Sequence, residues 1–284
     1  MIGNKMEERY VRFHEMGQGR ALIELAKQYP PKDAVREFVT NSLDARVPNT
    51  IEDILVMVLP KEKRVVISDN GIGMDYEELT ALPTNVGYSK KAGDTDTRGE
   101  KALGLLAFGS LGNRMHIRSK PHDSETDRYG YAMWEIDESK ERIPFDHKEL
   151  SEQDVRRHFY GGFNRGTRVV IDGVASHVLD KVLTIPNLKN WLRMFYTPAL
   201  RKGMVRMYLG RPDERSTEIR QELLKEIDYE RESSSELLDD TLDIPIKNEE
   251  ELGRLEVLLF VDPEASYDKV AVYSKDVLVY ESLG

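Results

Sequence analysis

A helix-forming segment followed by two β-rich runs is the feature that most constrains how this chain can fold. The segment after Pro30-Pro31 includes "VREFVTNSLDA", residues 35–45, whose apolar residues recur at helical spacing. The prolines suit the first turn of a helix, and Asp33 puts a carboxylate near the positive end of its dipole. The runs "DILVMVL" and "RVVISD" follow, joined by turn-like residues 60–63. The sequence therefore predicts an amphipathic helix that leads into a β-hairpin.

Further elements are expected on both sides of a glycine-rich stretch. We predict a helix at about residues 20–28, and between residues 70 and 112 a long mobile loop with short helices. Later strands are predicted at "MHIRSK", "YGYAMWEID" and "GTRVVIDG", followed by a helix over residues 185–203 and a strand at "MVRMYLG". After Pro212 we expect a charged helix from "EIRQELLKEIDYERE", a flexible serine- and acid-rich link, and strands at "GRLEVLLFVD", "KVAVYS" and "DVLVYESLG".

Composition narrows the class of protein. The 284 residues include no cysteine, which excludes disulfides, thiolate metal sites and a cysteine nucleophile. No long apolar run and no apolar signal core is present, so we expect a cytoplasmic protein, or a nuclear one in a eukaryote. The net charge of −10 argues against a protein that coats nucleic acid with its whole surface. DNA remains a candidate partner because cations gather in one segment: Lys189, Arg193, Arg201, Lys202, Arg206 and Arg211.

The helix at residues 35–45 carries a polar stripe. Glu37, Asn41 and Asp44 are spaced i, i+4 and i+7, which places them along one side of the helix. A carboxylate beside an amide oxygen can activate water and bind Mg²⁺, which prefers a few oxygen ligands together with waters and phosphates. A solvated helix face would explain the same stripe if the helix stood alone.

A second polar motif ends the hairpin. Asp69 closes the strand "VVISD" and could accept the exocyclic amino hydrogen of a purine. Gly71 and Gly73 would let the backbone approach the ring closely. An ordinary turn is the alternative, and the third glycine of the dinucleotide-binding fingerprint is missing.

Two further motifs are suited to phosphate and base. The run "NVGYSKKAGDTDTRGEKALGLLAFGSLG", residues 85–112, mixes glycines with cations and leads into an apolar helix. Backbone N–H groups at a helix N-terminus bind anions, and the cations would add charge. The run does not fit the Walker-type P-loop. In "RGTRVVID", Thr167 stands at a strand start, where its hydroxyl could lie beside the base.

The order of these four motifs resembles the GHKL ATPase superfamily of gyrase, heat-shock chaperones, histidine kinases and MutL. E-x-x-x-N-S-x-D-A, D-N-G-x-G-M, a glycine-rich lid and G-T follow one another between Lys32 and Asp172. "NVGYSKK" and "RGEKALGLL" are most similar to the branch of MutL, MORC-type ATPases and type IIB topoisomerase B subunits. The resemblance implies an α+β fold, a two-layer α/β sandwich of the Bergerat type. Its sheet would be mixed and largely antiparallel, with helices on one face and a partial second α/β region after it.

The resemblance also implies a role for each matched residue. Glu37 would act as the general base towards water, Asn41 would bind Mg²⁺ through its side-chain oxygen, and Asp44 would support the nucleotide site. Asp69 would receive the adenine amino group. The other nucleotide-binding residues would be Gly71, Gly73, Met74 and Thr167 around the base, and Ser89, Lys90, Arg98, Gly99, Glu100, Lys101 and Gly104 over the phosphates.

The activity implied is Mg²⁺-dependent ATP binding and hydrolysis, with lid closure and an ATP-bound homodimer. Residues 1–212 would form the ATP-binding domain, with residues 1–19 as a candidate dimerisation strap. Residues 213–284 would form a charged linker and a partial transducer-like region. The cycle could serve DNA or chromatin transactions. Two alternatives stay open: a protein kinase of the histidine-kinase-like type, and a nucleotide-gated chaperone or binding module with negligible hydrolysis.

Overall fold

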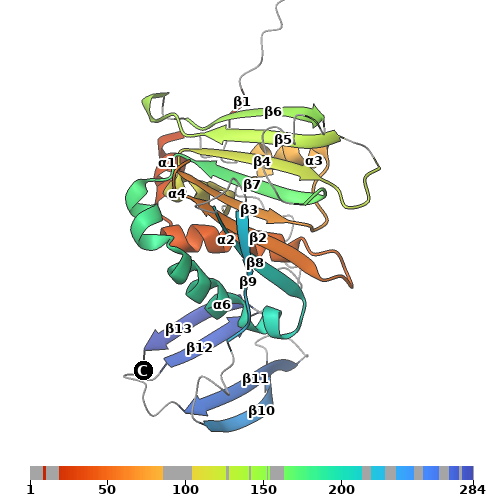
Figure 1. Ribbon diagram of the computed structural model, residues 1–284, viewed down its shortest axis with the longest axis vertical. Coiled ribbons are helices and arrows are strands. Elements are labelled where there is room, and N and C mark those ends of the chain that lie inside the picture. The colour runs from red at the N-terminus through yellow and green to blue at the C-terminus, as the bar shows by residue number, and fades with distance from the viewer. Residues whose placement is uncertain are drawn as a thin grey trace, which may run out of the picture.

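The fold is built around one nine-stranded sheet (Figure 1). The computed structural model describes residues 9–10, 19–85, 104–125, 128–140, 142–151, 153, 163–212, 219–227, 235–245, 252–261, 269–274 and 277–283. The strands of the sheet are β1 (Arg9–Tyr10), β2 (Glu52–Leu59), β3 (Arg64–Asp69), β4 (Arg114–Lys120), β5 (Arg128–Glu135), β6 (Pro144–Ser151), β7 (Gly166–Asp172), β8 (Val205–Pro212) and β9 (Ile219–Leu223).

Neighbouring strands in this sheet run antiparallel, with one exception. The spatial order is β1-β6-β5-β4-β7-β3-β2-β8-β9, and only the β2–β8 pair is parallel. The expected mixed, largely antiparallel sheet is therefore confirmed. The predicted hairpin is confirmed as well, since β2 and β3 pair from Ile54 opposite Asp69 to Leu59 opposite Arg64.

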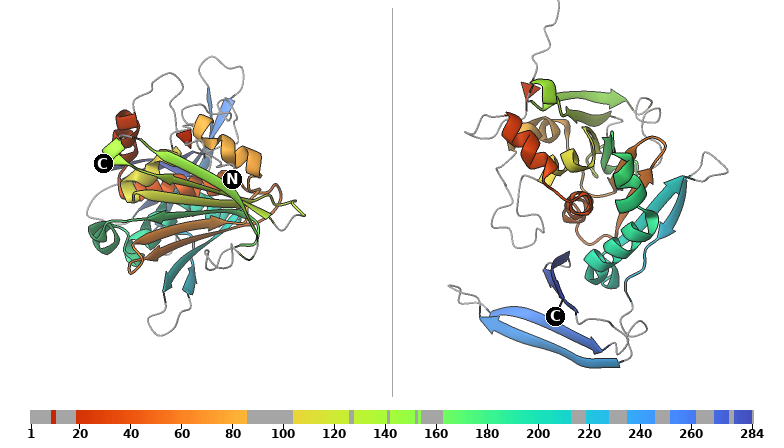
Figure 2. Two further views of the ribbon diagram at one scale, coloured as in Figure 1. Left: turned by 90° about the horizontal axis from the view of Figure 1, so that it is seen from above. Right: turned by 90° about the vertical axis from the view of Figure 1, so that its left-hand side faces the viewer.

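Helices cover one face of the sheet. Residues alternate between the two faces of a strand, so Ile54, Val56 and Val58 join the main core under the helices, while Leu55 and Met57 form a small cluster on the other face. Figure 2 shows α1, α2 and α6 gathered on one side of the molecule. The helical elements are α1 (Gly19–Lys27), α2 (Pro31–Asp44), α3 (Tyr76–Ala81), η1 (Leu82–Asn85), η2 (Gly104–Ala107), α4 (Phe108–Leu111), η3 (Glu138–Lys140), the π-helical η4 (Val178–Val182) and α6 (Ile185–Arg201).

Helix α2 packs against both the sheet and α6. Its apolar side is buried, and Val39 is fully inaccessible to solvent. Tyr196 of α6 also fixes the helix, because its hydroxyl donates to the carbonyl oxygen of Arg36 at 3.0 Å. The same hydroxyl lies 2.9 Å from Thr40 Oγ1. The position of the polar stripe on α2 is therefore set by packing against the sheet and α6.

The charged helix predicted after Pro212 is wrong. Residues Ile219–Leu223 form β9, which pairs antiparallel with β8 and places Leu223 opposite Tyr208. Leu224 is buried in the main core, and its N–H donates to the carbonyl oxygen of Met207 at 2.8 Å. Pairing with the sheet edge and burial of this leucine outweigh the helix propensity of the segment.

The C-terminal residues form two separate hairpins. β10 (Ser235–Pro245) pairs with β11 (Leu252–Val261), and β12 (Lys269–Ser274) pairs with β13 (Val277–Leu283). The three strands expected after residue 250 are confirmed, whereas β10 occupies part of the segment expected to be a flexible link. None of the helices in the described ranges is long and apolar enough to cross a membrane.

Candidate functional site

Asp69 is a buried carboxylate with a nearly complete set of hydrogen-bond donors. It ends β3 on the helix-covered face and is 3% exposed. Its Oδ1 accepts from the backbone N–H groups of Gly71 at 3.1 Å and Thr167 at 3.0 Å. Its Oδ2 accepts from Ser42 Oγ of α2 at 2.9 Å. A carboxylate offers about four lone-pair positions, so these described donors leave room on Oδ2 for one further N–H.

Burial makes this carboxylate sensitive to pH. Desolvation raises the pKa of Asp69 from 3.8 to about 6, against the opposing effects of its three hydrogen bonds and the charge of Arg118. The group is therefore mostly ionised at neutral pH and can act as an acceptor there. Ser42 was not among the predicted site residues, although its position beside Asn41 in N-S-x-D offered a signal.

Two glycines allow the loops around Asp69 to pack tightly. Gly73 has φ +68°, and a Cβ there would lie 2.2 Å from the carbonyl oxygen of Lys120. Gly166 has φ +83°, and a Cβ there would lie 2.3 Å from the carbonyl oxygen of Asp69. Any side chain at either position would be strained and would also collide with backbone, so both loops depend on glycine.

Met74 and Thr167 meet at a second serine. The N–H of Met74 donates to Ser119 Oγ at 2.8 Å, and Thr167 Oγ1 lies 2.9 Å from the same oxygen. Nothing in "MHIRSK" marked Ser119 as a site residue, because its partners are distant in the sequence. The structure thus gathers Asp69, Gly71, Gly73, Met74 and Thr167 in one place.

Glu37 lies against the end of the predicted lid. It is half-buried on α2, and η2 packs against α2 and α1. A Cβ at Gly104, the first residue of η2, would lie 2.7 Å from Glu37 Oε2. The glycine therefore lets the chain approach the carboxylate closely. Glu37 also adds to the effect of burial in raising the pKa of Tyr29.

The other two residues of the polar stripe differ in exposure. Asn41 is exposed and Asp44 is half-buried. Within the described ranges, no three His, Cys, Asp or Glu side chains form a group that could hold a metal ion. One amide oxygen on an accessible helix face fits Mg²⁺, which uses few protein ligands and fills the other positions with waters and phosphates.

Part of the predicted site falls outside the described residues. This is true of six lid residues, namely Ser89, Lys90, Arg98, Gly99, Glu100 and Lys101. It is also true of most of the candidate strap at residues 1–19, of which Arg9 and Tyr10 are described as β1 paired with β6.

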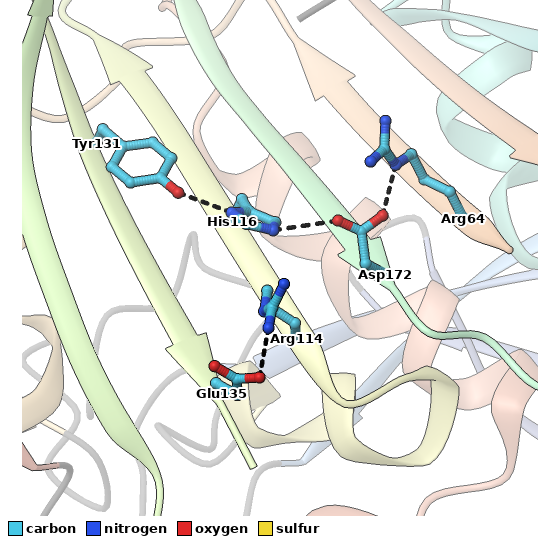
Figure 3. A network of polar contacts seen from close by, with 6 residues as sticks. All are labelled: Arg64, Arg114, His116, Tyr131, Glu135 and Asp172. Atoms are coloured by element: carbon cyan, nitrogen blue, oxygen red, sulfur yellow. Dashed lines mark hydrogen bonds and ion pairs between the residues drawn. The ribbon is translucent and has the colours of Figure 1, made fainter. Parts of the chain in front are cut away.

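A polar network lies on the opposite face of the sheet (Figure 3). His116 alternates with the core-facing Met115 on β4, and its Nε2 lies 3.1 Å from Asp172 Oδ2. Arg64 Nε donates to Asp172 Oδ1 at 2.5 Å, and His116 Nδ1 lies 2.8 Å from the hydroxyl of Tyr131. Burial opposes ionisation of Asp172, but hydrogen bonds from His116 and Arg64 outweigh it and lower the pKa to about 2. The network joins four adjacent strands and is separate from Asp69.

One family model matches the part of the chain that holds most of the candidate site. Residues 29–159 match a family model described as histidine kinase-, DNA gyrase B-, and HSP90-like ATPase. The matched segment contains α2, the Asp69 loop and Gly104, while Thr167 follows it. Together with the fold, the match supports the GHKL superfamily, and with it ATP binding, for this part of the chain. No curated protein matches the chain significantly.

Proposed function

We propose that this chain binds ATP with Mg²⁺ and hydrolyses it with water activated by Glu37. The observation that carries the proposal is the Ser42–Asp69 hydrogen bond, which fixes α2 beside the open acceptor position of Asp69. Glu37 precedes Ser42 by five residues, or about 7.5 Å along the helix axis. A nucleotide whose base lies at Asp69 could then extend its phosphates along α2 towards Glu37 and the lid.

In the proposed reaction each residue has a separate task. Asp69 Oδ2 accepts the adenine amino hydrogen, and the loops at Gly73 and Thr167 enclose the base. Glu37 takes the proton of the attacking water, whose oxygen bonds to the γ-phosphorus while the bond to the β-phosphate oxygen breaks. Asn41 supplies one oxygen for Mg²⁺, which neutralises phosphate charge when bound. Products are ADP and inorganic phosphate.

Lid closure and dimerisation belong to the same proposal. The end of the lid at Gly104 packs on α2 and α1, and α1 directly follows the candidate strap. Helix α4, which follows η2, also lies close to α1, since a Cβ at Gly109 would lie 2.6 Å from Ala26 Cβ. Phosphates that draw the lid residues inwards would therefore act on the helix attached to the strap. Light scattering with a non-hydrolysable ATP analogue should show a dimer, and a monomer at saturation would refute this part.

Binding of the base tests the proposal directly. Titration calorimetry with Mg²⁺-ATP should show saturable binding. Asp69→Asn should weaken this binding at least about 30-fold, because the side-chain NH₂ group of the variant would face the adenine amino group, and both are donors. Asp180→Asn is the matched control, since this aspartate is exposed on η4. Equal affinity of the Asp69 variant and the wild type would exclude Asp69 as the base acceptor.

The alternatives predict different products. A kinase would transfer the γ-phosphate to a protein, whereas an ATPase releases it as inorganic phosphate, so labelled ATP distinguishes the two. A binding module with negligible hydrolysis would bind ATP and release no phosphate over many minutes. Retention of a carboxylate at Glu37, beside the lid end, favours water as the acceptor.

DNA as a partner stays a prediction. At least three of the six cations that suggested it are engaged within the chain: Lys189 with Glu222, Arg206 with Asp53, and Arg193 with two backbone carbonyl oxygens. If DNA is the partner, it should stimulate phosphate release, and the effect should fall steeply with salt. Absence of stimulation at low salt would exclude this use of the cycle.

A further inference from the structure

The side chain of Ser119 connects the two loops that flank Asp69. Ser119 lies on β4 and is fully buried, with 0% exposure. Its Oγ accepts a hydrogen bond from the N–H of Met74 at 2.8 Å. The same oxygen lies 2.9 Å from Thr167 Oγ1 and 3.3 Å from the carbonyl oxygen of Gly166. One hydroxyl therefore contacts both the D-N-G-I-G-M loop and the start of β7.

The number of protons available limits how these three contacts can be satisfied. A serine hydroxyl has one proton and two lone pairs. The N–H of Met74 can only donate, so it occupies one lone pair. The carbonyl oxygen of Gly166 can only accept, so it takes the Ser119 proton. The second lone pair then accepts the proton of Thr167, and the Thr167 oxygen is left with lone pairs to present to the nucleotide site.

We infer that Ser119 is a positioning residue that makes Thr167 a hydrogen-bond acceptor and so selects a 6-amino purine over a 6-oxo purine. The inference rests on the proposed function. Asp69 and Thr167 would then offer two acceptors, since the Thr167 N–H is bonded to Asp69 itself. An exocyclic amino group has two hydrogens for them. A 6-oxo group has no hydrogen to donate, and its lone pairs would face those of Asp69 and Thr167.

Selectivity between two nucleotides separates this role from simple support of the loops. We would measure dissociation constants of ATP and inosine triphosphate, which carries an oxygen in place of the 6-amino group. Ser119→Ala should raise the ATP constant about 3- to 10-fold, as expected for loss of one neutral hydrogen bond, and leave the inosine triphosphate constant nearly unchanged. The ratio of the inosine triphosphate constant to the ATP constant, which measures the selectivity for ATP, should therefore fall by the same factor.

A matched serine provides the control. Ser68 is also 0% exposed and precedes Asp69, but its Oγ has no hydrogen-bond partner among the described residues. Ser68→Ala should leave the ratio unchanged. Thr167→Val removes the second hydroxyl without changing its shape, and it should lower the ratio as much as Ser119→Ala does. The double variant should lower it no further, because the two hydroxyls act as one unit.

Several results with these variants would overturn the role assigned to Ser119. If Ser119→Ala raises both dissociation constants by the same factor, the ratio stays unchanged and Ser119 only supports the loops. If it changes neither constant, Ser119 has no role at the base. Either result would overturn the inference. Additive effects of the Ser119 and Thr167 variants would also overturn the inference. If Ser119→Ala does not fold, an unchanged ratio in Thr167→Val overturns it equally. A wild-type protein that binds neither nucleotide would instead refute the proposed function, and the inference with it.

Discussion

Asp69 should make this protein less stable as pH rises from about 4 to about 7. Its pKa is about 6 in the folded protein, against 3.8 for an ordinary aspartate, which we take for the unfolded chain. Between these values the folded state binds a proton that the unfolded state has released. Stability therefore falls with rising pH over this window. Asp172 acts in the opposite sense, because its pKa is lowered to about 2. Its ionised carboxylate stabilises the folded protein above the ordinary aspartate pKa, and this stabilisation is lost as pH falls towards 2.

The size of the effect follows from the shift. A difference of about 2 pKa units corresponds to about 3 kcal/mol, and most of it, about 2 kcal/mol or more, falls between pH 4 and 7. Asp69→Asn removes the titrating group. The free energy of unfolding of the wild type minus that of the variant should therefore decrease by this amount as pH rises.

Urea denaturation followed by the fluorescence of Trp134 and Trp191 would measure this difference. Other carboxylates titrate in both proteins and cancel in the subtraction, and Asp180→Asn, at an exposed position of η4, is the control substitution. A difference between wild type and Asp69→Asn that stays constant with pH, or increases, would show that Asp69 is not a desolvated carboxylate. It would also weaken the case for a buried acceptor at the base site.

Two substitutions test other contacts in the same region. Gly104→Ala should reduce phosphate release at least about 10-fold, because a Cβ there would lie 2.7 Å from Glu37 Oε2 and displace that carboxylate. The circular dichroism spectrum should be unchanged. Full activity would show that the close contact between Gly104 and Glu37 is unimportant. Tyr196→Phe should lower the free energy of unfolding by about 1–3 kcal/mol, because the Arg36 carbonyl oxygen and the Thr40 hydroxyl lose a buried partner, and a change within about 0.5 kcal/mol would contradict this.

Elements with a strong local pattern could be predicted from the sequence. Helix α2 has an apolar side at helical spacing and prolines in its first turn, and the β2–β3 hairpin has two β-rich runs around a short turn. β9 and β6 could not be predicted in this way. The segment of β9 has the composition of a charged helix, and "PFDHKELS" of β6 has mostly polar residues, so only pairing with a neighbouring strand makes either one a strand.

The same division holds for the site. Glu37, Asn41 and Asp69 belong to motifs short enough to recognise in one chain. Ser42 and Ser119 do not stand out, because a serine gains its role here only from partners 27 and 45 or more positions away. Local spacing can indicate which residues hold a ligand, whereas the residues that orient them depend on how distant segments pack.

The central claim is that Glu37 activates water at a bound ATP, and one paired measurement on Glu37→Gln tests it most directly. ATP affinity and phosphate release would be measured on the same preparations of wild type and variant. The account predicts an ATP dissociation constant within about twofold of the wild type and phosphate release reduced at least about 100-fold. A variant that binds ATP and releases phosphate at the wild-type rate would contradict the account.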